Sequence, residues 1–254
     1  MLTALGRQVI AALTFVGDSL MLLAHAMRYV LRGQIGLRRT LHQMAIAGAD
    51  SFPIVVVTLF TVGMAWGWHT AAYMVRFGAT SYFGGSTAVA ITRELGPALC
   101  GVVVAARVGA AFAAELGTMT VTEQIDALRA LAVNPIYYLV VPRLLACAIM
   151  LPLLTVIADA SGLLGAYLLS VHFGISAGEY MGSIQRWLVP INIYGGVIKA
   201  FCFGIIVAIV GCRQGLSTTG GAAGVGRATI GAVVLSIVLI YATNLFLTAA
   251  IFQH

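Results

Sequence analysis

Residues 136–171 read IYYLVVPRLLACAIMLPLLTVIADASGLLGAYLLSV, a run in which Arg143 and Asp159 are the only charged side chains. The run is longer than the ~20 apolar residues that an α-helix needs to cross a bilayer. Elsewhere in the chain, four similar runs occupy residues 41–75, 86–116, 190–210 and 228–252. We therefore predict an all-α polytopic membrane protein with five transmembrane helices, formed as a single domain over residues 1–254.

The composition supports this class and excludes a water-soluble globular protein. Hydrophobic residues make up 61% of the chain and charged residues only 9%, against roughly 25% charged in a typical soluble domain. Lysine and arginine total 14 against 8 acidic residues, a formal net charge of +6. Because most of the arginines flank apolar runs, this excess is expected to set membrane topology, and it does not indicate a nucleic-acid partner.

The N-terminal segment, residues 1–31, predicts a helix that lies along the membrane surface and does not cross it. Apolar residues recur there at spacings of three and four, as on one face of a helix: Leu2, Leu5, Val9, Leu13, Val16, Leu20 and Leu23. Arg7, Gln8 and Asp18 fall between them. Because these charges interrupt the run and no clear cleavage site follows, the segment is expected to be retained and not removed as a signal peptide.

The arginines also predict the orientation of the spans. They cluster just ahead of the first span and in two further segments on the same side, as Arg28, Arg32, Arg38, Arg39, Arg129, Arg213 and Arg227. The opposite side carries chiefly Arg76 and Arg186. The positive-inside rule therefore places the N-terminus in the cytoplasm and, after five spans, the C-terminus on the periplasmic side. On that outer side, residues 172–188 mix charged and aromatic side chains, which suits a short helix at the headgroup level.

Two further patterns concern the packing of the spans. Prolines lie inside them at Pro53, Pro97, Pro142 and Pro152, where each is expected to remove a backbone hydrogen bond and to kink the helix. Small residues recur every four positions in three spans, which indicates close helix packing within the chain or across a dimer. These residues are Gly101, Ala105, Gly109, Ala113 and Gly117; Ala158, Gly162, Ala166 and Ser170; and Gly196, Ala200, Gly204 and Ala208.

A polar segment, residues 119–133, separates the second and third spans, and we predict a short cytoplasmic helix there. Thr120 and Glu123 have the spacing of a capping box, and Asn134-Pro135 would end the helix. The residues expected on its apolar side are Ile125, Leu128 and Leu131 or Ala132. Such a helix suits docking to a partner; from these residues alone, a plain surface loop is an equally good interpretation.

Ionisable residues inside spans are costly and usually face a cavity or a partner. The candidates here are Arg93, Glu94, Arg107, Glu115, Asp159 and Lys199. A cation at Arg93 or Lys199 would attract a lipid phosphate, and Glu94 would balance that positive charge. A structural ion pair between spans is the alternative. Asp159 is interpreted as a packed polar contact in preference to a transport residue.

No catalytic, nucleotide or metal site is predicted on this chain. The glycines of residues 221–226 superficially resemble a phosphate-binding loop, but Arg227 and Ala228 stand where that loop needs a lysine and a hydroxyl residue, and no strand precedes them. The cysteines form no CxxC pair and are interpreted as buried small hydrophobic residues: Cys100, Cys147, Cys202 and Cys212. The chain is therefore expected to hold no cofactor and to be no enzyme, so that any ATP hydrolysis would take place on a separate subunit.

Several stretches of the chain together form a recognisable set. They are Glu94-Leu-Gly-Pro97, Ala105-Ala-Arg-Val-Gly-Ala110, Ala114-Glu-Leu-Gly-Thr-Met119, Glu123-Gln-Ile-Asp-Ala-Leu128, Asn134-Pro135, Thr218-Thr-Gly-Gly-Ala-Ala-Gly-Val-Gly-Arg-Ala-Thr229 and Asn244-Leu-Phe-Leu-Thr248. The set closely resembles the MlaE/YrbE permeases, and the resemblance covers nearly the whole chain. It implies the permease subunit of an ABC transporter that moves phospholipid or a related lipid between the inner membrane and a periplasmic carrier.

The same resemblance implies a set of partners and site residues. The partners are a second copy of the chain in a homodimer, cytoplasmic ABC ATPase subunits that hold ATP and magnesium, a periplasmic MCE-domain lipid-binding protein, and a small cytoplasmic accessory subunit. Arg93, Glu94 and Lys199 would surround an outward-open lipid cavity. The polar segment would be the coupling helix, and the residues expected to transmit the motion of the ATPase are Glu115, Thr118, Glu123, Gln124, Asp126 and Arg129.

Two other functions compete with this interpretation. A secondary carrier driven by protons or sodium could use Glu94, Asp159 and Glu115 as a relay, although no inverted repeat is visible in the sequence. A membrane scaffold that transports nothing and supports an outer complex is the third possibility.

Overall fold

The computed structural model describes residues 2–252, except for the side chains of residues 2–5, 7–9, 11 and 12. These residues form helices and no strand. The α-helices are α1 (Leu2–Leu31), α2 (Leu37–Met44), α3 (Phe52–Arg76), α4 (Phe83–Ala90), α5 (Gly96–Val104), α6 (Ala110–Val121), α7 (Gln124–Ala130), α8 (Val141–His172), α9 (Ala177–Trp187), α10 (Pro190–Leu216) and α11 (Gly221–Ile251). Four π-helical segments and one 3₁₀ turn join some of them: η1 (Ala45–Ala49), η3 (Ile91–Leu95), η4 (Ala105–Gly109) and η5 (Ile136–Val140), with η2 (Thr80–Tyr82) as the 3₁₀ turn.

Five helical stretches are long and apolar enough to cross a membrane. They are Leu37–Arg76, Thr80–Val121, Ile136–His172, Pro190–Leu216 and Gly221–Ile251. Each overlaps one of the five spans predicted from hydropathy. The prediction of an all-α polytopic membrane protein is confirmed.

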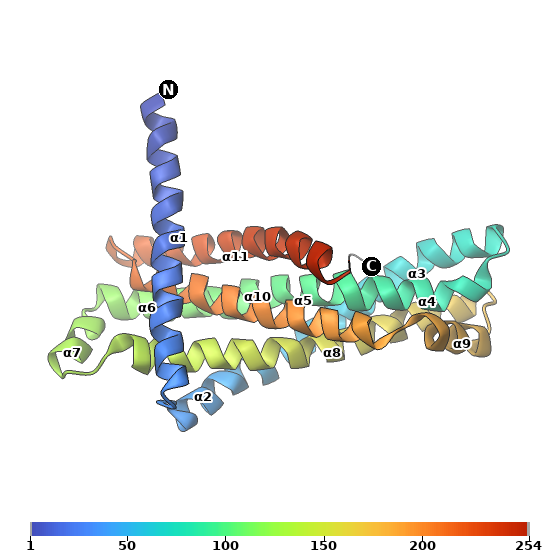
Figure 1. Ribbon diagram of the computed structural model, residues 1–254, viewed down its shortest axis with the longest axis horizontal. Coiled ribbons are helices and arrows are strands. Elements are labelled where there is room, and N and C mark those ends of the chain that lie inside the picture. The colour runs from blue at the N-terminus through green and yellow to red at the C-terminus, as the bar shows by residue number, and fades with distance from the viewer. Residues whose placement is uncertain (1, 253–254) are drawn as a thin grey trace.

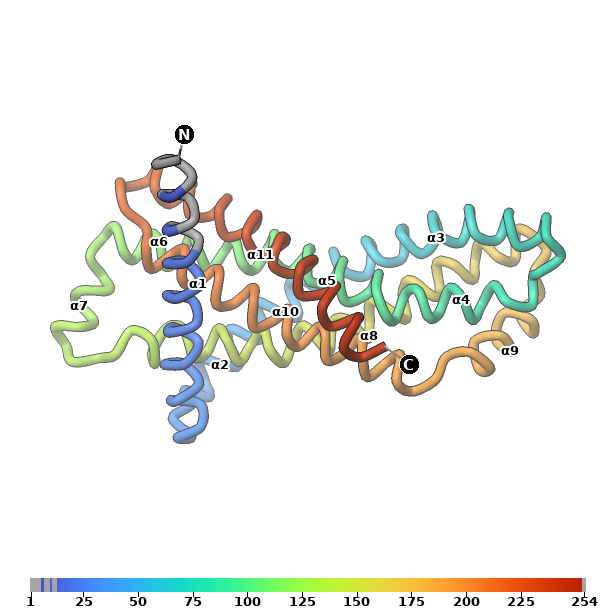
Figure 2. The backbone as a smooth tube through the Cα atoms, turned by 45° about the horizontal axis from the view of Figure 1, so that its top comes forward, coloured from blue at the N-terminus to red at the C-terminus, as the bar shows by residue number. Residues whose placement is uncertain are grey.

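The five stretches run along the long axis of the molecule (Figure 1). The short helix α7 lies at one end of this bundle and α9 lies at the other, and we name the two ends accordingly. The N-terminal helix α1 crosses the bundle at a steep angle near the α7 end in both views (Figures 1 and 2).

Helix α1 attaches to the bundle through its middle and its C-terminal half. Leu22 and Ala26 are buried, and Asp18 accepts a hydrogen bond from Arg213 of α10 at 3.0 Å. In the part of the chain that the structure describes, α1 is not among the stretches fit to cross a membrane. If the bundle crosses the membrane, a helix that lies along the membrane surface must run across the bundle axis, as α1 does. Part of its predicted apolar and polar pattern lies outside the described side chains: Leu2, Leu5, Arg7, Gln8 and Val9.

Three of the four span prolines occupy the first turn of an α-helix, and two of these helices directly follow a π-helical segment. Pro97 follows η3 and Pro142 follows η5, whereas Asp50 and Ser51 separate η1 from the helix that contains Pro53. A π turn bonds each N–H five residues back, which accommodates a following residue that has no N–H to offer. At Pro97 and Pro142 the predicted kinks are therefore π-to-α transitions, whereas Pro53 follows a short turn and Pro152 lies inside α8.

The small-residue stripes pack within this chain. A Cβ atom at Gly204 of α10 would lie 2.5 Å from the Cys147 carbonyl oxygen of α8. One at Gly196 would overlap the Thr92 carbonyl oxygen of η3. Only glycine allows these approaches, which bring α10 against both neighbours. Lys199 lies between the two glycines, so the same contacts place it beside η3.

The predicted outer segment, residues 172–188, contains the short helix α9. A capping box starts it, because Glu179 N–H donates to Ser176 Oγ at 3.2 Å and Ser176 N–H donates to Glu179 Oε2 at 3.3 Å. Tyr180 packs against Phe83 of α4 and donates its hydroxyl to the Leu163 carbonyl oxygen at 2.9 Å. Burial raises the pKa of Tyr180 above its usual value, which keeps this hydroxyl a donor.

The polar segment between the second and third spans begins differently from the prediction. Helix α6 continues to Val121, and the Thr120 hydroxyl donates to the Leu116 carbonyl oxygen at 2.8 Å. Glu123 adopts a left-handed φ of 61°, and α7 starts after it at Gln124 without a side-chain cap. The predicted capping box is wrong, because the preceding helix already uses the threonine.

Helix α7 ends through its own backbone and not at the predicted Asn134-Pro135 stop. Val133 N–H donates to the Leu128 carbonyl oxygen at 2.9 Å, and Ala132 N–H donates to the Arg129 carbonyl oxygen at 3.0 Å. Ala132 has a positive φ of 57°. This is the pattern of a Schellman motif, with alanine in the position that glycine usually takes.

Candidate functional site

A group of charged and polar side chains lies where η3, α10 and α11 meet. Lys199 donates hydrogen bonds to Glu94 Oε1 at 2.9 Å and to Thr248 Oγ1 at 2.8 Å. Its third hydrogen bond goes to the Arg93 carbonyl oxygen at 2.7 Å. Glu94 Oε2 accepts a hydrogen bond from Asn244 Nδ2 at 2.7 Å. We call this group the charged cluster; it comprises Arg93, Glu94, Asn192, Lys199, Asn244, Thr248 and Phe252.

The local backbone explains why the Arg93 carbonyl oxygen is free to bind Lys199. In a regular α-helix it would accept a hydrogen bond from the N–H of residue 97, but Pro97 has none. The N–H of Gly96 bonds to the Ile91 carbonyl oxygen, as the π turn requires. Lys199 therefore bonds to an oxygen that lacks its regular α-helical donor, which links α10 to the second span.

Burial divides the roles within the charged cluster. The Lys199 side chain is 0% exposed, whereas the Glu94 side chain is 39% exposed. An ammonium group has three N–H donors, and all three of these are used inside the chain. Lys199 therefore joins three helices and orients Glu94, while a ligand that approaches the cluster meets Glu94 and Arg93.

Arg93 is held in position and keeps donors free. Its Nε donates to Asn192 Oδ1 at 2.7 Å, and its guanidinium carbon lies 4.3 Å from the centre of the Phe252 ring. A guanidinium has five N–H donors, and the others of Arg93 have no hydrogen-bond partner within residues 2–252. A positioned guanidinium with free donors is suited to a phosphate group.

All three residues predicted for lipid binding thus lie in one cluster, and the ion pair that was the alternative is also present. Their contact with lipid stays a prediction. The polar partners on α10 and α11 were not predicted as site residues from the sequence. Asn244 and Thr248 did carry a signal, because they lie four residues apart in an apolar span, where polar side chains often bond across helices.

Asp159 is a charged residue of the third span that lies outside the charged cluster. It is buried in α8, and its Oδ1 has no hydrogen-bond partner among the described atoms. A Cβ atom at Gly96 would overlap this oxygen, so the carboxyl group packs directly on the backbone of α5. No hydrogen bond in residues 2–252 connects Asp159 with Glu94 or Glu115.

Arg107 and Glu115 make separate contacts nearer the α7 end. Arg107 donates to the Ile46 carbonyl oxygen at 3.0 Å and to Ser51 Oγ at 2.9 Å. Glu115 forms an ion pair with Arg143 of α8 at 2.6 Å. Glu115, predicted for coupling, therefore ties α6 to the start of the third span.

The α7 end presents a polar surface. Ile125 is buried and Leu128 is half-buried on the inner side of α7, as predicted, whereas Leu131 is 74% exposed. The placement of Leu131 or Ala132 on the apolar side was wrong, because both are exposed where the left-handed Ala132 of the Schellman motif ends the helix. The exposed residues, which we call the α7 surface, are Glu115, Thr118, Thr122, Glu123, Gln124, Asp126, Arg129 and Leu131. They include all six residues predicted for coupling.

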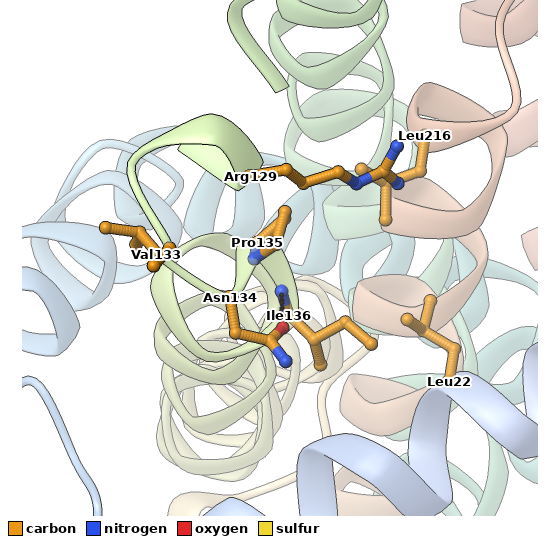
Figure 3. Close-up of a pocket in the computed structure, with 8 residues that line it drawn as sticks. Leu22, Arg129, Val133, Asn134, Pro135, Ile136 and Leu216 are labelled. Atoms are coloured by element: carbon orange, nitrogen blue, oxygen red, sulfur yellow. Dashed lines mark hydrogen bonds between the residues drawn. The ribbon is translucent and has the colours of Figure 1, made fainter. Parts of the chain in front are cut away.

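A cavity of about 530 Å³ opens beside the α7 surface (Figure 3). Leu22 of α1, Arg129 of α7 and Leu216 of α10 line it, together with residues 132–136. A side chain inserted there by a partner would contact three elements at once. The α7 surface and this cavity together have the form of a docking site.

The described residues contain no group of three or more His, Cys, Asp or Glu side chains that could hold a metal ion. The cysteines are free thiols, three of them buried: Cys100, Cys147 and Cys212, with Cys202 half-buried.

Comparison with known proteins gives consistent matches. Residues 40–250 match the family model described as Permease MlaE. A probable ABC transporter permease protein of Synechocystis is 44% identical over 89% of this chain and 86% of its own length. One from Rickettsia felis is 38% identical over 98% of this chain and 97% of its own length. Protein TRIGALACTOSYLDIACYLGLYCEROL 1 of Arabidopsis thaliana chloroplasts is 42% identical over 88% of this chain, which spans 64% of that longer protein.

Proposed function

Because the chain belongs to the MlaE family of ABC transporter permeases, we propose that it moves phospholipid or a related lipid between the inner membrane and a periplasmic carrier with an MCE domain. ABC permeases work with an ATPase subunit, so ATP and magnesium would be bound by that partner and not by this chain. The name of the Arabidopsis relative contains that of a glycolipid, which supports a lipid as the transported class.

The charged cluster is the observation that carries the proposal. Ionisable groups in an apolar bundle are costly and mark pathways for substrates. Arg93 offers free guanidinium donors to a phosphate diester, and the exposed part of Glu94 can accept a hydrogen bond from an amine or hydroxyl headgroup. The fully buried Lys199 bonds to both residues, to the Glu94 carboxylate and to the Arg93 backbone carbonyl oxygen. A lipid headgroup contains both kinds of group that this arrangement would bind.

We also propose an orientation and an assembly. The α7 end would face the cytoplasm, together with the N-terminus, and the C-terminus would lie on the periplasmic side of the inner membrane. Arg129, Arg213 and Arg227 on the segments at the α7 end support this orientation. The ATPase would dock on the α7 surface, the MCE-domain protein would bind at the opposite end, and two copies of the chain would form a homodimer. A small cytoplasmic accessory subunit would join the ATPase.

Affinity purification of the solubilised chain from its native membrane tests this assignment. We expect an ABC ATPase and an MCE-domain protein to co-purify and to be identified by mass spectrometry. A chain that purifies without any partner would favour an ion-driven carrier, and one that brings only extracytoplasmic proteins would favour a scaffold. Either result would contradict the proposal.

A further inference from the structure

A second cavity, of about 540 Å³, lies between α2 and the junction of η5 with α8. Its lining includes Arg38, Arg39, His42, Gln43, Tyr138 and Arg143, and none of its lining residues is acidic. We call it the basic cavity. It shares no residue with the charged cluster or with the cavity beside the α7 surface.

The basic cavity carries uncompensated positive charge. Arg143 is paired with Glu115, but Arg38 and Arg39 form no ion pair in the part of the chain that the structure describes. The Arg39 guanidinium carbon lies 4.0 Å from the centre of the Tyr138 ring. This cation–π contact holds the guanidinium at the cavity, where an isolated surface arginine would extend into solvent.

Two buried polar atoms on the lining residues have no hydrogen-bond partner. Arg143 is 6% exposed, and its Nε donor is unpaired among the described atoms, as is the Gln43 Oε1 acceptor. Buried polar atoms nearly always have partners. The wall of the basic cavity therefore holds one donor and one acceptor that no group of the described chain uses.

The surfaces that continue from the basic cavity along the bundle are apolar. On α8, Ile149, Leu153 and Val156 follow Pro142 on one helix face and are exposed. On α2, Leu41 is exposed beside the cavity. The acyl chains of a lipid whose headgroup occupied the cavity would lie along these side chains.

We propose that the basic cavity binds the headgroup of an acidic phospholipid from the surrounding membrane, with its phosphate diester between Arg38 and Arg39. The inference does not rest on the proposed transport function, because it concerns a separate cavity and a lipid that stays in place. The bound lipid joins α2 to the start of α8. Because Arg143 at the start of α8 is paired with Glu115, the lipid also stabilises the position of α6, which leads to the α7 surface.

The thermal unfolding midpoint of the delipidated protein in neutral detergent tests this site. Phosphatidylglycerol should raise the midpoint saturably by roughly 5–10 °C, whereas phosphatidylcholine and inorganic phosphate should have little effect. The double variant Arg38→Gln/Arg39→Gln should lose most of the rise. The matched double variant Arg28→Gln/Arg32→Gln removes two exposed arginines outside the cavity and should keep it.

Three results would overturn the proposal. An undiminished rise in Arg38→Gln/Arg39→Gln would place the lipid elsewhere, and an equal loss in both double variants would show only general charge attraction. Equal protection by inorganic phosphate would show that the ligand is a free anion and not a lipid. If the double variant does not fold, the single variant Arg38→Gln, at an exposed position, should still lose at least half of the rise.

Discussion

Replacing Glu94 with alanine is expected to lower the free energy of unfolding by about 3 kcal/mol, because the fully buried Lys199 ammonium then lacks its carboxylate. In detergent this corresponds to a fall in the thermal unfolding midpoint of roughly 6–12 °C. Phospholipid retained through purification should fall as well, since Glu94 and Arg93 form the exposed part of the charged cluster. Mass spectrometry of the extracted lipid measures this loss per chain.

The double variant Glu94→Ala/Lys199→Met separates the two roles of the pair. With both charges gone, no ammonium is left unpaired, so most of the stability should return. Bound lipid should stay low, because the headgroup site is still incomplete. If bound lipid recovered together with stability, the pair would serve only to join helices. Glu123→Ala, which removes an exposed carboxylate at the α7 end, should leave both quantities unchanged.

Reversing the charges of Glu123 and Asp126 to lysine is expected to uncouple the permease from its ATPase. Both side chains are exposed on the α7 surface, and like charges placed against a complementary partner weaken binding by at least roughly tenfold. The fold should survive, because exposed substitutions change stability by only about 0.5 kcal/mol and the Asp126–Arg129 pair is exposed on both sides. Co-purification of the ATPase and lipid-stimulated ATP hydrolysis report the effect.

The matched control reverses two exposed charges at the opposite end of the bundle. The variant Arg76→Glu/Arg186→Glu alters side chains that are as exposed as those on α7, but it should leave the ATPase bound. Retention of the ATPase and of normal hydrolysis by the α7 variant would rule out α7 as the docking element. Loss of the ATPase in both variants would point to a general effect of charge.

The spans and the charged residues of the cluster could be predicted because each leaves a local signal. A run such as residues 136–171 is apolar over a bilayer's thickness, and Lys199 is a charge inside another such run. An ionisable residue in a span needs a partner, and this rule led to the prediction that Arg93, Glu94 and Lys199 lie together. The pattern could not show that Lys199 would be completely buried, because that depends on how closely Gly196 and Gly204 let α10 approach its neighbours.

The wrong capping-box prediction has a different cause, because two local structures compete for the same residue. Thr120 has capping-box spacing from Glu123, yet α6 extends through it and its hydroxyl bonds inside that helix. The Arg143–Glu115 pair and the Asn244 contact to Glu94 join different helices. Such pairings depend on helix register, which hydropathy does not encode. The π segments were likewise unforeseen, although two of them directly precede a helix with proline in its first turn.

ATP-dependent transfer of labelled phospholipid tests the central claim most directly. The permease, its ATPase and its MCE-domain partner would be reconstituted in liposomes, and the label exchanged between bilayer and carrier would be followed over time. The proposed function predicts transfer that requires ATP hydrolysis and is lost in the Glu123→Lys/Asp126→Lys variant. Transfer that proceeds without ATP and follows an imposed proton or sodium gradient would contradict it.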